Sequence, residues 1–167
     1  MKRQSMQPIV ASGAKILLLG SMPGEQSLIK QQYYGNRRNH FWSIISDLLN
    51  EDFTSYSYNH KCQRLNAHGI ALWDVIASCE REGSLDSAIR HEKANDLKGL
   101  LQQYPTIKWI GLNGTKAYQS FLTYKKNVVD FPELPFTKLP STSPVPGKNV
   151  KSYEEKVEAW REMSHYL

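Results

Sequence analysis

Short apolar runs alternate with amphipathic segments along this chain. The apolar runs are continuous, as in strands that are buried on both faces of a parallel sheet. They occupy residues 15–19, 69–76, 107–112 and, more weakly, 136–139. The amphipathic segments carry apolar residues at helical spacing and predict helices at 41–49, 58–68, 97–104, 114–124 and from Ser152, which forms a capping box with Glu155. Residues 1–10 show neither pattern, and we expect a loose terminus there.

The order of these segments predicts the fold class. Strands that alternate with helices indicate βαβ units, which place a parallel sheet between two layers of helices. We therefore predict an α/β fold, a three-layer αβα sandwich with a central, mainly parallel four-stranded sheet, in a single domain spanning residues 1–167. Ligands of such sheets bind at the carboxyl ends of the strands. The predicted strands end in unusual residues, which indicates one composite site, at Ser21–Gly24, Asp74, Asn113–Thr115 and Pro140–Pro144.

Composition and charge narrow the classes of function. A formal net charge of +5 favours a polyanionic partner such as nucleic acid, although many basic proteins bind no polyanion. The two cysteines show no CxxC spacing and the five histidines no HxxxH spacing, so we expect no disulfide, metal or cofactor. The longest apolar run is too short to span a membrane, and no secretory signal opens the chain. We expect a cytoplasmic monomer with no membrane partner.

The turn after the first strand, Gly20–Gly24, is a candidate pocket lining. Its backbone amides can turn toward a ligand, or it can be an ordinary connection between a strand and a loop. It is not a phosphate-binding P-loop, because the Lys-Ser/Thr pair that ends that motif is missing.

The segment from Tyr34 to Asn39 combines an aromatic ring, two cations and an amide. An aromatic face can stack on a nucleic-acid base, at about 1–3 kcal/mol per base, and Arg37 and Arg38 can contact phosphates. The Asn39 amide can hold a water molecule or a ring edge. The alternative is a solvated basic loop whose tyrosines belong partly to the core. Phe41 and Trp42 begin the apolar face of a helix and are expected in the core.

Two further sites follow from the strand exits. A carboxylate is costly to bury without a partner, so Asp74, within an apolar strand, is either a strand-end cap or ion-pair partner, or a functional group. The stiff loop after the last strand carries hydroxyls that suit phosphate oxygens, with a cation downstream; alternatively it is a simple surface connection. Its candidate DNA contacts are Ser141, Thr142, Ser143, Pro144 and Lys148.

From about Lys15 to Leu167 the chain resembles the uracil-DNA glycosylase superfamily, most of all its mismatch-specific and hypoxanthine-DNA glycosylase branches. Gly20–Gly24 resembles the first motif, and Asn39–Trp42 resembles the Asn-Arg-Phe-Trp portion that follows it. The segment 69–79 is similar to the strand that carries the base-reading residue, which aligns with Asp74. Pro140–Pro144 resembles the loop that enters the DNA minor groove, and Ser84–Ser87 is similar to a segment of the hypoxanthine branch.

The resemblance implies a catalytic position and shows where the chain departs from it. Several branches have Asp or Asn at the place of Met22, where that residue positions or activates the attacking water. In the hypoxanthine branch the resemblance implies that the catalytic amide is Asn39. Asn36-Arg37 replaces the His-Pro pair that often precedes this stretch, which alters the expected DNA contacts.

The implied activity is a monofunctional DNA glycosylase that excises a deaminated base, preferably hypoxanthine, flipped out of DNA. Tyr34 would stack on the base and Asp74 would accept from a ring N–H. The turn residues Ser21, Met22, Pro23 and Gly24 would hold a base carbonyl through backbone amides. One alternative is an enzyme specific for uracil or thymine in mismatches with guanine, which Met22 disfavours. The alternative of another class is a catalytically silent nucleic-acid-binding module.

Overall fold

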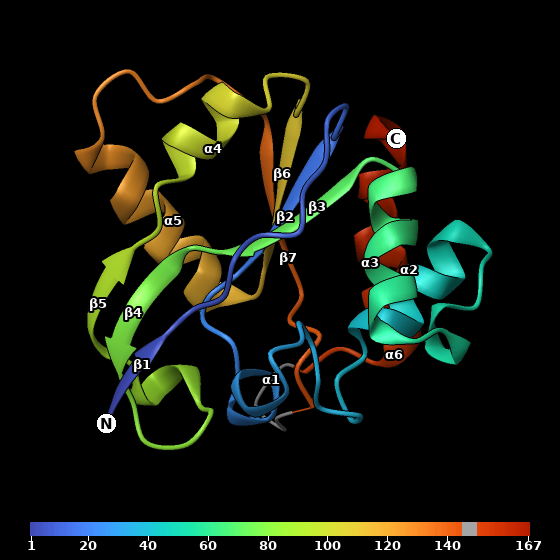
Figure 1. The fold of residues 1–167 in the computed structure, drawn as a ribbon, viewed down its shortest axis with the longest axis horizontal. Coiled ribbons are helices and arrows are strands. Elements are labelled where there is room, and N and C mark those ends of the chain that lie inside the picture. The colour runs from blue at the N-terminus through green and yellow to red at the C-terminus, as the bar shows by residue number, and fades with distance from the viewer. Residues whose placement is uncertain (145–149) are drawn as a thin grey trace.

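The computed structural model describes residues 1–144 and 150–167, and a parallel four-stranded sheet forms its centre (Figure 1). The sheet consists of β2 (Ile16–Gly20), β3 (Ile70–Asp74), β6 (Trp109–Asn113) and β7 (Phe136–Leu139). The strands lie in the order β3-β2-β6-β7, and all three neighbouring pairs are parallel. The predicted α/β class and central sheet are confirmed.

Helices cover both faces of this sheet, which makes three layers (Figure 1). One layer contains α2 (Phe41–Leu49), α3 (Tyr58–Ala67) and α6 (Tyr153–Trp160), which begins at the predicted capping box. The other contains α4 (Leu97–Gln103) and α5 (Thr115–Asn127). Alternate residues of β2 explain its continuous apolar run, because Ile16 and Leu18 pack in one core cluster and Leu17 and Leu19 in the other. No helix in the described part of the chain is long and apolar enough to cross a membrane.

A second, antiparallel sheet lies beside the first and was not predicted. It consists of β1 (Lys2–Gln4), β4 (Ile76–Glu80) and β5 (Arg90–Ala94), in the order β1-β4-β5. The expectation of a loose terminus at residues 1–10 is therefore wrong: β1 pairs with β4, Met6 is buried, and Ile9 forms a bridge with Leu72. The strands β1 and β5 are polar edge strands, and polar edges carry no hydrophobic alternation that a sequence pattern could reveal.

We predicted one strand for the apolar run at 69–76, and this prediction is wrong. The strand β3 ends at Asp74, and the chain crosses at Val75 into β4 of the other sheet. Val75 packs with the α4 and α5 side of the core, whereas Ile76 packs in a separate small cluster with Met22, Cys79 and Ile89. The run stays apolar across the change of sheet because both residues are buried, so hydrophobicity alone does not show the break.

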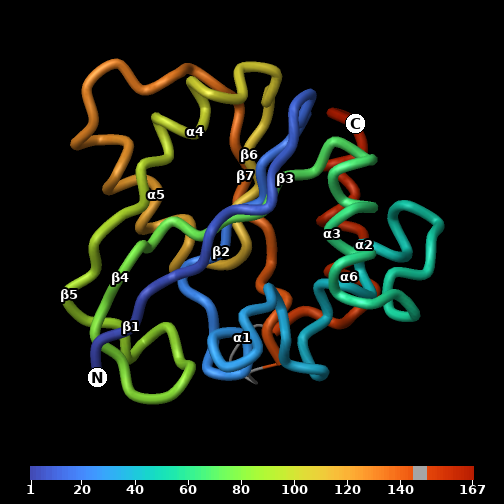
Figure 2. Tube along the Cα trace, in the orientation of Figure 1, coloured from blue at the N-terminus to red at the C-terminus, as the bar shows by residue number. Residues whose placement is uncertain are grey.

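The carboxyl ends of the parallel strands meet at one edge of the molecule. The Cα trace in Figure 2 shows the segments after β2 and β7 near one another at this edge, next to the short helix α1 (Glu25–Lys30). The backbone N–H of His40 donates to the carbonyl of Thr142 at 2.9 Å, which joins these two segments directly. Short 3-10 helices complete the described fold at Phe53–Ser55 (η1), Asp86–Ala88 (η2) and Arg161–Tyr166 (η3).

Candidate functional site

Asp74 lies at the strand exits, as the last residue of β3 and the parallel partner of Gly20 in β2. Its side chain is 4 % exposed and accepts a hydrogen bond from the Ser5 hydroxyl at 3.1 Å. Burial raises the pKa of Asp74 to about 7; the bond from Ser5 opposes this rise, and the charge of Asp86 adds to it. Asp74 is thus hydrogen-bonded rather than ion-paired within the described residues, and it can exist in both protonation states near neutral pH.

Tyr34 lies next to Asp74 and is held in an unusual backbone conformation. Its φ of 53° is left-handed, which costs a tyrosine of the order of 1–3 kcal/mol. Two contacts hold it: the ring stacks on Phe41 with centroids 3.9 Å apart, and the hydroxyl accepts from the Asn113 amide at 3.2 Å. Phe41 covers one face of the Tyr34 ring, so only the other face is available for stacking on a ligand.

Gly20 makes room for both of these groups. A Cβ atom placed on Gly20 would lie 2.7 Å from the Asp74 carboxylate oxygen Oδ1 and 3.4 Å from the Tyr34 hydroxyl. The carboxylate and the phenol therefore converge on the same backbone position. The glycine that ends β2 allows this convergence because it carries no side chain.

Asn39 lies two residues before the start of α2, and half of its amide is bound to the backbone there. Its side-chain oxygen accepts from the backbone N–H of Phe41 at 2.9 Å, which leaves the amide NH₂ group as a donor.

Asn39 and Tyr34 line a cleft of about 410 Å³. The cleft has three cationic lining residues and no acidic one, and these cations are Lys30, Arg37 and Lys61. Arg37 and Arg38 are exposed and form no ion pair with a described residue.

The turn from Ser21 to Gly24 presents its backbone rather than its side chains. The Ser21 hydroxyl donates to Asp86 Oδ1 at 2.7 Å. The Met22 side chain is 7 % exposed and packs in the small apolar cluster with Ile89. Within the described residues, the backbone N–H groups of Met22 and Gly24 form no hydrogen bond. The binding of a ligand carbonyl by these two amides stays a prediction.

The loop after β7 is fixed by Thr142, whose placement differs from the expected DNA contact. Thr142 is 1 % exposed; its hydroxyl accepts from the Asn113 amide at 3.0 Å and its backbone N–H donates to the Asn113 side-chain oxygen at 3.0 Å. Thr142 can reach Asn113 because Asn113 pairs with Leu139 at the ends of β6 and β7. These bonds anchor the loop to the protein interior. Ser141 is exposed and Ser143 and Pro144 are half-buried, whereas Lys148 lies outside the described residues.

Two residues of this site, Ser5 and Arg81, were not predicted from the sequence, and Asn113 was predicted only as part of the composite site at the strand exits. Asn113 joins Tyr34 to Thr142, and its position at a strand exit was the only signal for it. Ser5 reaches Asp74 from the segment expected to be loose. Arg81 is 2 % exposed and donates to the carbonyl of Pro23. Neither Ser5 nor Arg81 stands in a motif or an apolar pattern, so only the folded structure reveals them.

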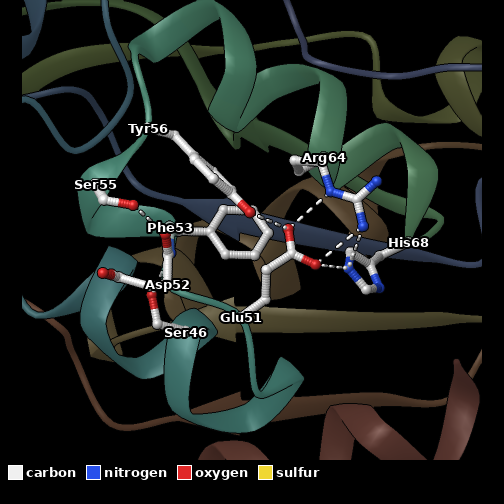
Figure 3. Close-up of polar contacts among 8 residues, drawn as sticks. All are labelled: Ser46, Glu51, Asp52, Phe53, Ser55, Tyr56, Arg64 and His68. Carbon is white, nitrogen blue, oxygen red and sulfur yellow. Dashed lines mark hydrogen bonds and ion pairs between the residues drawn. The ribbon is translucent and has the colours of Figure 1, made fainter.

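The most extensive ionic cluster lies elsewhere (Figure 3). Glu51 accepts two hydrogen bonds from Arg64, at 2.7 and 2.9 Å, one from Tyr56 at 3.2 Å, and contacts His68 at 3.0 Å. The cluster ties the end of α2 to α3, and its members satisfy one another, so we interpret it as structural. Among the described residues, no group of three His, Cys, Asp or Glu side chains could hold a metal ion.

Comparisons with known proteins identify the family of this chain. A family model described as the uracil DNA glycosylase superfamily matches residues 8–164. Two proteins named hypoxanthine DNA glycosylase, from Methanosarcina barkeri and Methanosarcina acetivorans, are 37 % and 38 % identical over 117 residues, which is 70 % of this chain and 74 % of each relative. A solution NMR structure of a candidate uracil DNA glycosylase from Methanosarcina acetivorans superposes with a TM-score of 0.78 at 33 % identity, over 99 % of this chain and 100 % of that one. The resemblance seen in the sequence is confirmed: the chain belongs to the uracil DNA glycosylase superfamily.

Proposed function

We propose that this protein is a DNA glycosylase that hydrolyses the N-glycosidic bond of a deaminated base, with hypoxanthine as the preferred base. The observation that carries this proposal is the buried Asp74 carboxylate, which converges with the Tyr34 hydroxyl on Gly20 at the edge where the strands end. The two relatives named hypoxanthine DNA glycosylase support the choice of base. A base inside a duplex cannot reach such a site, so the nucleotide has to flip out of the helix.

Asp74 supplies the discrimination between hypoxanthine and adenine. In its ionised form it accepts a hydrogen bond from the N1–H of hypoxanthine, whereas adenine presents a lone pair at N1 and is repelled. Uracil and xanthine also carry a ring N–H, so Asp74 alone does not separate these bases from hypoxanthine. The open face of Tyr34 stacks on the flipped ring, and the free amides of Met22 and Gly24 hold a base carbonyl.

Asn39 is the proposed catalytic residue. Bond cleavage develops negative charge on the leaving base, and a preorganised donor stabilises that charge. The Asn39 oxygen is engaged by the backbone N–H of Phe41, which leaves its NH₂ group as a donor, and Asn39 is one of the residues that line the cleft. Among the described residues, none of the lysines stands at the end of a central strand as a Schiff-base nucleophile would, so we propose water as the nucleophile and a monofunctional enzyme.

The DNA backbone is bound around this site. Arg37 and Arg38 are exposed cations next to Asn39 and are free to contact phosphates. Ser141, Ser143 and Pro144 belong to the described part of the loop proposed to enter the vacated space, and Lys148, a further proposed DNA contact, lies outside the described residues. We propose that the protein acts as a monomer in the cytoplasm, on DNA that contains a deaminated base.

The test is strand cleavage after alkali, on duplex oligonucleotides that each carry one hypoxanthine, uracil, xanthine or mismatched thymine. We expect multiple-turnover release at hypoxanthine. The Asn39→Ala variant should lose about 10²- to 10³-fold in rate and still bind the DNA. Asn36→Ala is a matched control, because Asn36 makes the same kind of contact, to the backbone N–H of Arg38 at 2.9 Å.

Three other outcomes would change the proposal. Release only at uracil or mismatched thymine would leave a glycosylase but overturn the choice of base. Undiminished turnover in Asn39→Ala would remove Asn39 from catalysis. DNA binding without release from any oligonucleotide would favour a silent binding module.

A further inference from the structure

The β4–β5 hairpin packs along the base-binding turn, one residue after another. Three residues of the turn, and the first residue of α1 after it, meet partners in the hairpin, although the two segments are about 60 residues apart in the chain. The polar partners are Asp86 for Ser21, Arg81 for the Pro23 carbonyl and Ser84 for the backbone N–H of Glu25, and the apolar partner of Met22 is Ile89. The hairpin therefore forms a second wall of the turn that is proposed to hold the base.

Asp86 makes the least expected of these contacts. It is an exposed residue and the first residue of η2, where a carboxylate could cap its own helix, yet η2 has no side-chain cap. Asp86 Oδ1 instead accepts from the Ser21 hydroxyl at 2.7 Å, and Ser21 is only 8 % exposed. A hydrogen bond to a charged group is about twice as strong as one between neutral groups. The contact thus fixes the start of the turn from outside the central sheet.

On this basis, and resting on the proposed function, we propose that Asp86 is a positioning residue that holds Ser21 and the turn in the geometry needed for base excision. A shift of about 1 Å in a reacting group can cost 10²-fold in rate. The backbone N–H groups of Met22 and Gly24 lie one and three residues after Ser21. A displacement of Ser21 therefore moves these two amides as well.

The pH dependence of the rate is a second readout, and it depends on the groups that surround Asp74. Ser5 donates to it from the N-terminal segment, and Tyr33 and Tyr34 lie on the loop before α2. The hairpin contributes two opposite charges: Asp86 raises the pKa of Asp74 and Arg81 lowers it. The guanidinium of Arg81 is buried, and its Nε and Nη1 atoms have no hydrogen-bond partner among the described residues. Removing the Asp86 charge should therefore favour ionised Asp74 at lower pH.

The experiment compares single-turnover rates of hypoxanthine release by the full chain, from pH 5.5 to pH 9. Asp86→Ala removes the acceptor for Ser21, and Asp86→Asn keeps an amide oxygen there without the charge. Glu82→Gln is the matched control, because it removes one acid from the same hairpin, and Glu82 pairs with the N-terminal amine rather than with the turn. Thermal unfolding checks that each variant is folded; if Asp86→Ala is not, Asp86→Asn carries the test.

We expect Asp86→Ala to lose about ten- to a hundredfold in rate at pH 8, Asp86→Asn to lose less, and Glu82→Gln to match the wild type. The acid limb of the rate should move to lower pH in both Asp86 variants, because the pKa of Asp74 falls. Carbon NMR of the Asp74 carboxyl should show the same fall in the free protein. A purely structural loss would lower the rate equally at every pH.

Two results would overturn the inference in distinguishable ways. An active wild type whose Asp86 variants keep its rate and pH profile would refute the role of Asp86 and leave the proposed function standing. A wild type that releases no base from any of the oligonucleotides would overturn the proposed function and this inference with it.

Discussion

The substitution Asp74→Asn should make the protein more stable at alkaline pH while it removes the proposed base reader. The pKa of Asp74 is raised from 3.8 to about 7 by burial. Since each pKa unit corresponds to about 1.4 kcal/mol, ionising this carboxyl costs the folded state up to about 4 kcal/mol at pH 8. An asparagine carries no charge and can still accept from the Ser5 hydroxyl, so it avoids this cost.

The sign of the pH dependence follows from the raised pKa. Between pH 3.8 and about 7 the folded state keeps a proton on Asp74 that the unfolded state has lost. The contribution of Asp74 is therefore fully present below pH 3.8 and is lost as pH rises through about 7. The difference in stability between the variant and the wild type should be near zero at pH 4 and should grow to its full value by pH 8.

Urea unfolding of both proteins at pH 4, 6 and 8 measures this difference directly. Glu133→Gln is a suitable control, because Glu133 is an exposed acid on the loop before β7. The same variants should then be assayed for hypoxanthine release, which Asp74→Asn should lose. A variant that is less stable than the wild type at pH 8, or a difference that does not change with pH, would refute the assignment of a buried, destabilised carboxylate.

Two further predictions concern Gly20 and Glu51. Gly20→Ala would place a methyl group 2.7 Å from the Asp74 carboxylate. Base release should therefore fall by about tenfold or more while the fold persists. An unchanged rate with an unchanged melting temperature would show that the Asp74 side chain moves freely. The bonds from Arg64 and His68 lower the pKa of Glu51 from 4.5 to about 2, so its stabilising contribution is present above pH 4.5 and is lost as pH falls through about 2 (Figure 3). Unfolding of Glu51→Gln beside the wild type should therefore show a deficit at pH 7 that narrows by pH 3, and a deficit that is equal at both values would contradict this origin.

The sequence by itself determined the central sheet and the elements that flank it. The strands β2 and β6 are apolar because both of their faces are covered, so nearly every residue of these strands is buried. The strand β7 gave a weaker signal, because Lys138 is exposed and Leu139 is its one buried residue. The capping box at Ser152 is equally local, since both of its hydrogen bonds form within four residues. The strand exits carried Asp74 and the turn after Gly20, so the edge that holds the candidate site was also predicted from sequence.

Only the tertiary structure decided how that edge is assembled. The antiparallel sheet depends on the pairing of β1 with β4, which are far apart in the chain, and its polar edge strands leave no periodic signal. The bonds of Asp74 with Ser5 and of Ser21 with Asp86 each join residues more than 60 positions apart. Hydrophobic periodicity reports whether a residue is buried, but it does not report which partner a polar side chain meets. The central strands and the helices beside them can therefore be predicted from the sequence. The protonation state of Asp74 and the packing of the β4–β5 hairpin against the turn exist only once the chain has folded.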